Sequence, residues 1–288
     1  MLTRRLLIWG FLMLLISGCQ GEVEFTATAT ATSNLLDATA SQVPPTVTPF
    51  PEPTSSPLPT ATNPAPPPTE TPDAQICSPL EGVPLSGLAE IIYNPYSPPP
   101  PGSDDPHQGV DFAYTLPETG IGVSGGPVFS ALEGQVAGVI RDRFPYGNAV
   151  IIETPLEDLP DIPGLGPPGE AEPQVSITLT CPEIELPLPD GEGRSLYSLY
   201  AHMESPPDWE IGDTVACGEQ IGATGDSGNA LNPHLHVEMR VGPSGAIFES
   251  MAHYETRASD HEMAGYCRWR VSGDFALVDP MALLGEGE

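Results

Sequence analysis

The chain has 288 residues, of which 39 are Asp or Glu and nine are Lys or Arg, so its formal net charge at pH 7 is −30. All nine basic residues are arginines. A chain this acidic offers no basic surface for nucleic acid or for anionic lipid headgroups, which argues against both as binding partners.

Residues 1–18 predict a targeting segment that is not part of the fold. Two arginines precede an apolar run over 6–16, and small residues come directly before Cys19. This run is shorter than the about 20 residues of a membrane-spanning helix. LISGC at 15–19 resembles a bacterial lipobox, in which the cysteine is lipidated and becomes the new N-terminus. We therefore expect a lipoprotein anchored to the outer face of the bacterial cell membrane; an ordinary secretory peptide is the alternative.

Residues 19–76 predict a tether between that anchor and a folded domain. The segment is rich in Thr, Pro and Ala and carries few apolar side chains, so it cannot offset the entropy cost of folding. Proline favours extended polyproline II at about 3.1 Å per residue, so the tether could span up to roughly 170 Å.

Residues 77–288 predict one all-β domain, in which short apolar segments alternate with Gly/Pro turns. We expect mainly antiparallel strands in a sandwich or open barrel with a groove, few short helices, and a surface insertion over 155–174. A short helix is predicted over 246–257. The predicted strands are 110–114, 127–131, 134–140, 149–153, 175–180, 195–202 and 234–241.

Four cysteines besides Cys19 lie in the domain, and an even number in an exported chain predicts two disulfides with three possible connectivities. We favour Cys77–Cys267, joining the ends of the domain, and Cys181–Cys217 within it. No pair has CxxC spacing, which argues against a thiolate zinc site.

Two separated motifs supply metal-ligand chemistry. His107 and Asp111 flank a glycine in a turn that leads into a strand. His234 and His236 are two residues apart on a predicted strand, so both imidazoles share one face. Together they predict a Zn²⁺ site of two histidines and one carboxylate whose fourth position stays open, as in catalytic zinc sites. A further histidine, His202, ends another predicted strand.

Three motifs in this order resemble the lysostaphin/LytM-type zinc metallopeptidases, endopeptidases that cut peptide bonds in peptidoglycan. They are HQGVD at 107–111, YAH at 200–202 and GDSGNALNPHLHVE at 225–238. The flanking text is similar too, and the resemblance covers roughly 105–241. It includes GGPVFSALEGQVAGVI at 125–140, YGNAVII at 146–152 and IGDTVACGEQIGATG at 211–225.

The resemblance implies a role for each motif residue. His107, Asp111 and His236 would hold one Zn²⁺ per domain, and His202 and His234 would be unligated catalytic residues. We expect His234 to act as general acid and base and His202 to stabilise the oxyanion, although these roles could be exchanged.

The predicted function is a membrane-tethered, exported, monomeric zinc metalloendopeptidase that cleaves stem peptides or cross-bridges of peptidoglycan. A first alternative is a non-catalytic LytM-like lipoprotein that binds and activates another cell-wall hydrolase, but all five key residues are present. A second is a non-enzymatic surface lipoprotein with a structural metal, but structural zinc normally has four protein ligands.

Two segments could modify the groove. Residues 246–270 are unusual for the family and form either a lid or specificity element, or a decorated loop over the core. The proline-rich residues 97–101 lie close to the first motif and could cover the groove.

Overall fold

The computed structural model describes residues 74–100, 102–116, 118–160 and 179–285. The predicted targeting segment, Cys19 and nearly all of the tether lie outside the described residues, as do 161–174 of the predicted insertion and most of the predicted strand 175–180. Among the described residues, no helix is long and apolar enough to cross a membrane.

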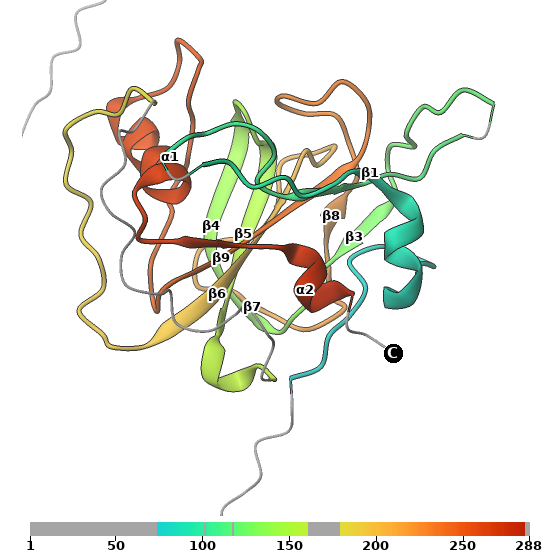
Figure 1. Cartoon of the computed structure of the whole chain (residues 1–288), viewed down its shortest axis with the longest axis horizontal. Coiled ribbons are helices and arrows are strands. Elements are labelled where there is room, and N and C mark those ends of the chain that lie inside the picture. Colours follow the sequence, from blue (N-terminus) through green and yellow to red (C-terminus); the bar gives the residue numbers. More distant parts are fainter. Residues whose placement is uncertain (1–73, 101, 117, 161–178, 286–288) are drawn as a thin grey trace, which may run out of the picture. The chain divides into compact units, whose positions relative to one another are not determined.

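The domain is built on an open antiparallel sheet of eight strands, in the order β1-β2-β9-β6-β5-β4-β7 with β10 also paired to β9 (Figure 1). A second sheet pairs β3 with β8. The predicted all-β, mainly antiparallel fold is confirmed. The strands are β1 (Ile92–Asn94), β2 (Val110–Phe112), β3 (Pro127–Phe129), β4 (Gly134–Arg143), β5 (Gly147–Pro155), β6 (Arg194–Ala201), β7 (Thr214–Val215), β8 (Gln220–Ala223), β9 (Leu235–Pro243) and β10 (Ala276–Val278).

The helices of the described part are few and short. Two are 3₁₀ helices, η1 (Leu85–Ile91) and η2 (Leu156–Asp158), and two are α-helices, α1 (Asp260–Val271) and α2 (Pro280–Leu284). The predicted helix over 246–257 is wrong. These residues form no helix: Phe248 donates its N–H to the carbonyl of Ala137 at 2.7 Å beside β4, and 254–257 form a bend and a turn. The helix starts later because Ser259 and Glu262 form a capping box at its N-terminus.

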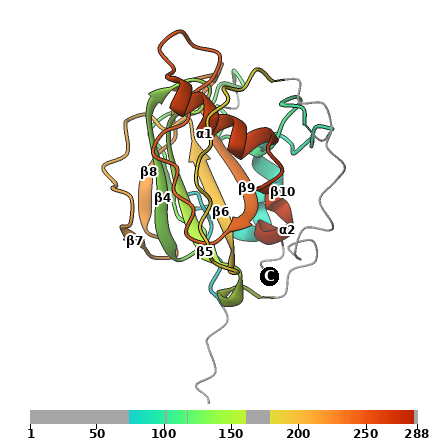
Figure 2. The same cartoon turned by 90° about the vertical axis from the view of Figure 1, so that its left-hand side faces the viewer.

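The main sheet buries a different apolar cluster on each face. One face packs against η1, α2 and the β3–β8 sheet, and includes Leu235, Val237 and Met239 of β9. The other face packs against α1 through Trp269 and Tyr266 (Figure 2). Because side chains alternate along β9, its remaining residues point toward the α1 side, where the polar site lies.

Two disulfides join the cysteines, but not in the favoured pairing. The structure pairs Cys77 with Cys217 and Cys181 with Cys267, at Cα–Cα distances of 5.7 and 6.0 Å. The favoured pairing assumed that the ends of the domain meet. Instead, Cys77 lies beside the β3–β8 side, where its N–H bonds the carbonyl of Ala131, whereas Cys267 lies in α1 on the other face of the main sheet.

Candidate metal centre and active site

Strand register brings the two predicted ligand motifs together. In the antiparallel pair of β2 and β9, Asp111 lies directly opposite His236. On the other side of β9, His236 lies opposite Ala201, the last residue of β6, so His202 follows within reach of the same place. Residues distant in sequence thus converge because they are cross-strand neighbours.

The loop before β2 carries His107 across the ring of His236. Its backbone pairs with Ser97, and its Nδ1 lies 3.0 Å from the carbonyl oxygen of Pro95. A Cβ on Gly109 would lie 2.6 Å from Cε1 of His236 and 2.5 Å from the carbonyl oxygen of Val237. The glycine in the HxGxD motif is therefore required by close approach of this loop to β9.

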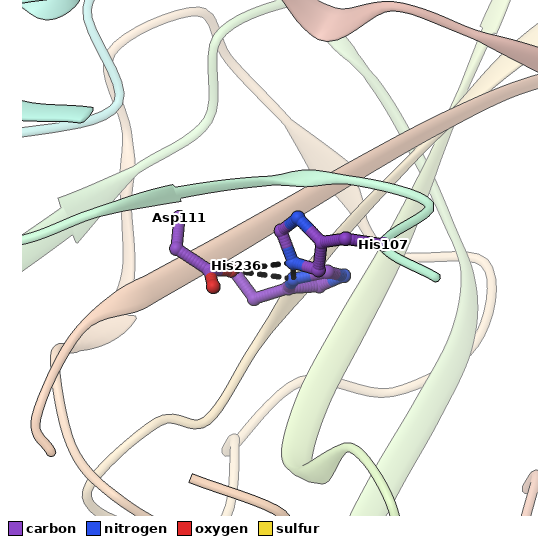
Figure 3. Close-up of side chains that lie close together, drawn as sticks. All are labelled: His107, Asp111 and His236. Carbon is purple, nitrogen blue, oxygen red and sulfur yellow. Dashed lines mark hydrogen bonds and ion pairs between the residues drawn. The ribbon is translucent and has the colours of Figure 1, made fainter. Parts of the chain in front are cut away.

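Three donor atoms meet at the centre of the site (Figure 3). Nε2 of His107 lies 3.1 Å from Oδ1 of Asp111 and 3.2 Å from Nδ1 of His236, and the last two atoms are 2.7 Å apart. Donors around a four-coordinate Zn²⁺ lie about 3.4 Å apart, because Zn–N and Zn–O bonds are about 2.0–2.2 Å long. Two imidazole nitrogens and one carboxylate oxygen fit zinc in chemistry, and at 2.7–3.2 Å they lie somewhat closer together than donors around a bound zinc ion.

The electrostatics keep Asp111 ionised. Burial raises the pKa of its carboxyl, but hydrogen bonding with His107 and His236 in their protonated forms, and the charge of those rings, outweigh burial and hold the pKa well below its usual range. Asn94 donates to Oδ2 of Asp111 at 3.1 Å, which leaves Oδ1 for the donor set. For His236, burial lowers the pKa, but Asp111 and Glu238 raise it to about 9.

His202 and His234 lie beside the donor set without joining it. Nε2 of His234 is 3.6 Å from Oδ1 of Asp111, and the ring centroids of His202 and His234 are 4.8 Å apart. Burial and then the imidazoles of His236 and His234 lower the pKa of His202 to about 3. His202 also has a positive φ of 61°, an uncommon conformation for a residue with a side chain.

Backbone carbonyls fix the tautomers of three of these rings. Nδ1 of His202 lies 2.7 Å from the carbonyl oxygen of Ser227, and Nδ1 of His234 lies 2.7 Å from that of Asn232, as His107 does with Pro95. A carbonyl oxygen only accepts, so each neutral ring carries its proton on Nδ1 and keeps a lone pair on Nε2. That is the tautomer in which His107 ligates through Nε2.

All five predicted residues line one cavity of about 460 Å³. Exposed Tyr93, Leu231 and Tyr254 also line it. A larger cavity of about 900 Å³, near Glu133 and Cys217, contains none of the five, so volume alone does not identify the site.

The two segments expected to modify the groove differ in their placement. Residues 97–100 do not line the cavity, and Ser97 instead pairs with the backbone of His107. The 246–270 stretch contributes Tyr254, Tyr266 and Arg270 to the cavity wall, so it is more than a loop over the core.

Sequence reasoning missed the polar residues behind the donor set. Glu238 and Arg240 follow His236 at intervals of two and are buried on the same face of β9. The alternation that placed His234 and His236 together could have found them. No such alternation predicted that Tyr146 or Arg270 would lie behind the donor set. Tyr146 comes from the turn before β5, and Arg270 comes from α1.

Comparison with known proteins finds a family match to part of this domain. A sequence model of Peptidase family M23 matches residues 190–248, a range that contains His202, His234 and His236 but not His107 or Asp111. The match confirms the resemblance to lysostaphin/LytM-type peptidases that the motifs predicted. A search of the curated proteins found no significant match.

Several solved structures are similar in fold at low identity. The catalytic domain of the prophage-encoded M23 protein EnpA from Enterococcus faecalis is 22% identical, with 55% of this chain and 87% of that chain covered and a TM-score of 0.32. The catalytic domain of the antimicrobial peptidase lysostaphin from Staphylococcus simulans is 19% identical, with 69% of this chain and 96% of that chain covered and a TM-score of 0.36. A zinc-containing peptidase from Vibrio cholerae is 22% identical, with 51% of this chain and 32% of that chain covered and a TM-score of 0.30. Likeness at this level carries no information about the chemistry of the site.

Proposed function

We propose that this domain is a zinc-dependent endopeptidase that hydrolyses peptide bonds of peptidoglycan, in stem peptides or cross-bridges. The observation that carries the proposal is the convergence of three ligand atoms and two further imidazoles on one open cavity. The family match over 190–248 also supports peptidase activity, and it does so without the HxGxD motif.

The residues that would hold Zn²⁺ are His107 through Nε2, Asp111 through Oδ1 and His236 through Nδ1. Zinc held by three protein ligands acts as a Lewis acid on a carbonyl oxygen and lowers the pKa of a water molecule. With only three protein donors, this arrangement leaves a fourth position open, which favours catalysis over a purely structural metal.

His234 is the better placed of the two remaining histidines for general base and acid work. Its Nε2, 3.6 Å from Oδ1 of Asp111, faces the donor set with a free lone pair. It can accept a proton from the attacking water and return it to the leaving amine.

His202 would stabilise the oxyanion, which requires a proton on its Nε2. Because its pKa is about 3, the neutral ring prevails near pH 7, so donation from Nε2 requires the other neutral tautomer, in which the ring proton moves from Nδ1 to Nε2 and the contact with the Ser227 carbonyl is given up. The exchanged assignment, with His202 as the base, would need a group of higher pKa to serve well near neutral pH.

The remaining parts of the proposal concern location. We infer from the sequence that Cys19 carries a lipid and that residues 19–76 hold the domain away from the outer face of the cell membrane, as a monomer. This arrangement would give the peptidase reach into the wall while retaining it on the cell.

The first experiment combines zinc analysis with digestion of purified peptidoglycan by wild type, His234→Ala and His107→Ala. We expect about one zinc in wild type and in His234→Ala, much less in His107→Ala, and loss of digestion in both variants. Zinc without digestion by wild type would favour the non-catalytic activator, and absence of zinc from wild type would contradict the metal centre itself.

A further inference from the structure

A fully buried carboxylate lies behind the ring of His236. Glu238 has 0% of its surface exposed, and its Oε2 lies 3.6 Å from Nε2 of His236, which has no closer partner among the described residues. Arg240 donates to Oε1 of Glu238 at 2.7 Å, and the hydroxyl of Tyr146 donates to Oε2 at 2.9 Å. Metal-ligating histidines commonly donate their second N–H to a carboxylate, and here the carboxylate faces that nitrogen at a distance somewhat longer than a direct hydrogen bond.

A second arginine links this carboxylate to the loop that carries the other histidine ligand. Arg270 donates from Nη1 to Oε2 of Glu238 at 2.8 Å. The same guanidinium donates from Nε to Oδ1 of Asp104 at 2.6 Å, and from Nη2 to the carbonyl oxygen of Asp104 at 2.9 Å. Asp104 precedes His107 by three residues, so one rigid fork bridges the surroundings of both histidine ligands.

Arg240 makes a parallel link that closes a ring. Its Nη2 donates to the side chain of Gln108, whose own amide donates to the carbonyl oxygen of Asp104 at 3.3 Å. Both arginines thus contact Glu238 on β9 and reach the loop over residues 104–108. The loop is held against β9 by charged side chains on the α1 side of the sheet.

Stability alone is a poor reason for this buried cluster. Taking charges out of water costs several kcal/mol per ion, and buried ion pairs can often be replaced by apolar groups without loss. The cost of burying these charges is explained if the cluster orients the residues of a neighbouring site. Here the carboxylate of Glu238 faces the ligand histidine His236. Arg270 comes from α1, which lies outside the family match at 190–248.

We propose that Arg270 is a positioning residue of the metal centre. It holds Glu238 toward Nε2 of His236, and this contact orients the ring so that the lone pair on Nδ1 points to the donor set. It also holds the backbone of Asp104, so that His107 reaches the donor set. The proposal rests on the proposed zinc site and assigns to α1 a part in building it.

The test measures zinc affinity of the full-length protein by competition with a chromophoric chelator, together with the visible absorption of the Co²⁺-substituted protein. Arg270→Gln should weaken zinc binding about 10–100-fold and alter the Co²⁺ spectrum. Arg270→Lys should recover part of the affinity, because one ammonium can hold Glu238 or Asp104 but lacks the fork that holds both.

The matched control is Arg268→Gln, on the same helix. Arg268 donates to the carbonyls of Leu186 and Pro187, away from the donor set, so its loss should leave zinc affinity unchanged. Equal weakening in Arg268→Gln would mean that loosening α1 is sufficient and would overturn the specific role of Arg270.

Near-UV circular dichroism checks that each variant folds. If Arg270→Gln does not fold, the nearly isosteric Asp104→Asn provides the reading, with zinc binding expected to weaken several-fold. Wild-type affinity in folded Arg270→Gln or in Asp104→Asn overturns the inference, and wild type without zinc overturns both proposals. Zinc affinities in the expected order without peptidoglycan digestion would support the positioning role and contradict only the proposed activity.

Discussion

Gly109 lies where the loop carrying His107 crosses the ring of His236, and its missing side chain permits that contact. Several side chains of this site depend on individual contacts with neighbouring residues. Each of three imidazoles is held at Nδ1 by a carbonyl oxygen, and Asp111 is held at Oδ2 by Asn94. Contacts with other protein groups therefore orient these side chains.

Gly109→Ala should reduce both stability and zinc affinity. The added methyl would overlap His236 and Val237, and overpacking of this kind costs about 1–3 kcal/mol. Urea unfolding and chelator competition measure the two effects. Gly87→Ala is the control, because its Cβ would meet nothing nearer than 3.4 Å. Equal behaviour of the two variants would contradict the close approach at Gly109.

The zinc-free protein should lose stability as pH rises from about 6.5 to about 9. The pKa of His236 is raised to about 9 in the fold, against about 6.5 when unfolded. The folded state therefore holds an extra proton in this window, so the free energy of unfolding is highest below pH 6.5 and falls as pH rises.

Urea unfolding at several pH values measures this slope. Asp111→Asn should flatten it, because hydrogen bonding and charge from Asp111 raise the pKa. Zinc-bound protein should also lack it, because the ligand nitrogen is then deprotonated throughout. A slope that persists in Asp111→Asn would assign the titration to another group.

Helix α1 is the element that carries Arg270 to the site. Its N-terminus is held by Ser259 and Glu262, its Cys267 is joined to Cys181, and its last turn delivers Arg270 to the buried cluster. Trp269 on the same helix packs into the apolar cluster of the sheet. The helix is thus fixed by a cap, a covalent bond and apolar packing at the distance from β9 that Arg270 requires.

Ser259→Ala should lower the free energy of unfolding by about 1 kcal/mol, because the N-cap acceptor for the backbone N–H of Glu262 is lost. Ser259→Asp should restore most of it, since aspartate caps helices equally well. Hydrogen exchange of amides in the first turn of α1 gives the local measurement. Unchanged exchange in Ser259→Ala would show that packing and the disulfide alone hold the helix end.

The chain consists of a long N-terminal region, for which only the sequence is described, and a folded domain. In the domain, a wide antiparallel sheet carries the site on the face next to α1. The cavity that contains the five predicted residues is open, and exposed aromatic and aliphatic side chains line it. An extended peptide could therefore reach the site from outside. We propose that an anchor at Cys19 delivers the domain to its substrate.

Cys19→Ala should release the protein from membranes without changing the activity of the domain. Loss of the acylated cysteine removes the affinity of about 0.8 kcal/mol per buried methylene group. Membrane fractionation and digestion of soluble peptidoglycan measure the two properties separately. Retention of Cys19→Ala in the membrane fraction would contradict lipid anchoring at this position.

The sequence by itself determined the fold class and the main strands, and it predicted five site residues that the structure brings to one cavity. This was possible because the information is local: period-two alternation places His234 and His236 on one face of β9, and a glycine marks the turn between His107 and Asp111. The short strands β1, β7, β8 and β10 have two to four residues each and carry no such period. The start of α1 did have a local signal, the Ser259–Glu262 capping box, which the prediction over 246–257 overlooked.

Only the tertiary structure decided which cysteines pair and which charges meet. Cys77 and Cys267 lie toward opposite faces of the main sheet, so these two cysteines do not pair. The contacts of Arg270 with Asp104 and Glu238 span 166 and 32 residues. Such contacts depend on how helices and loops pack against a finished sheet, and neither spacing nor local propensity in the chain encodes that packing.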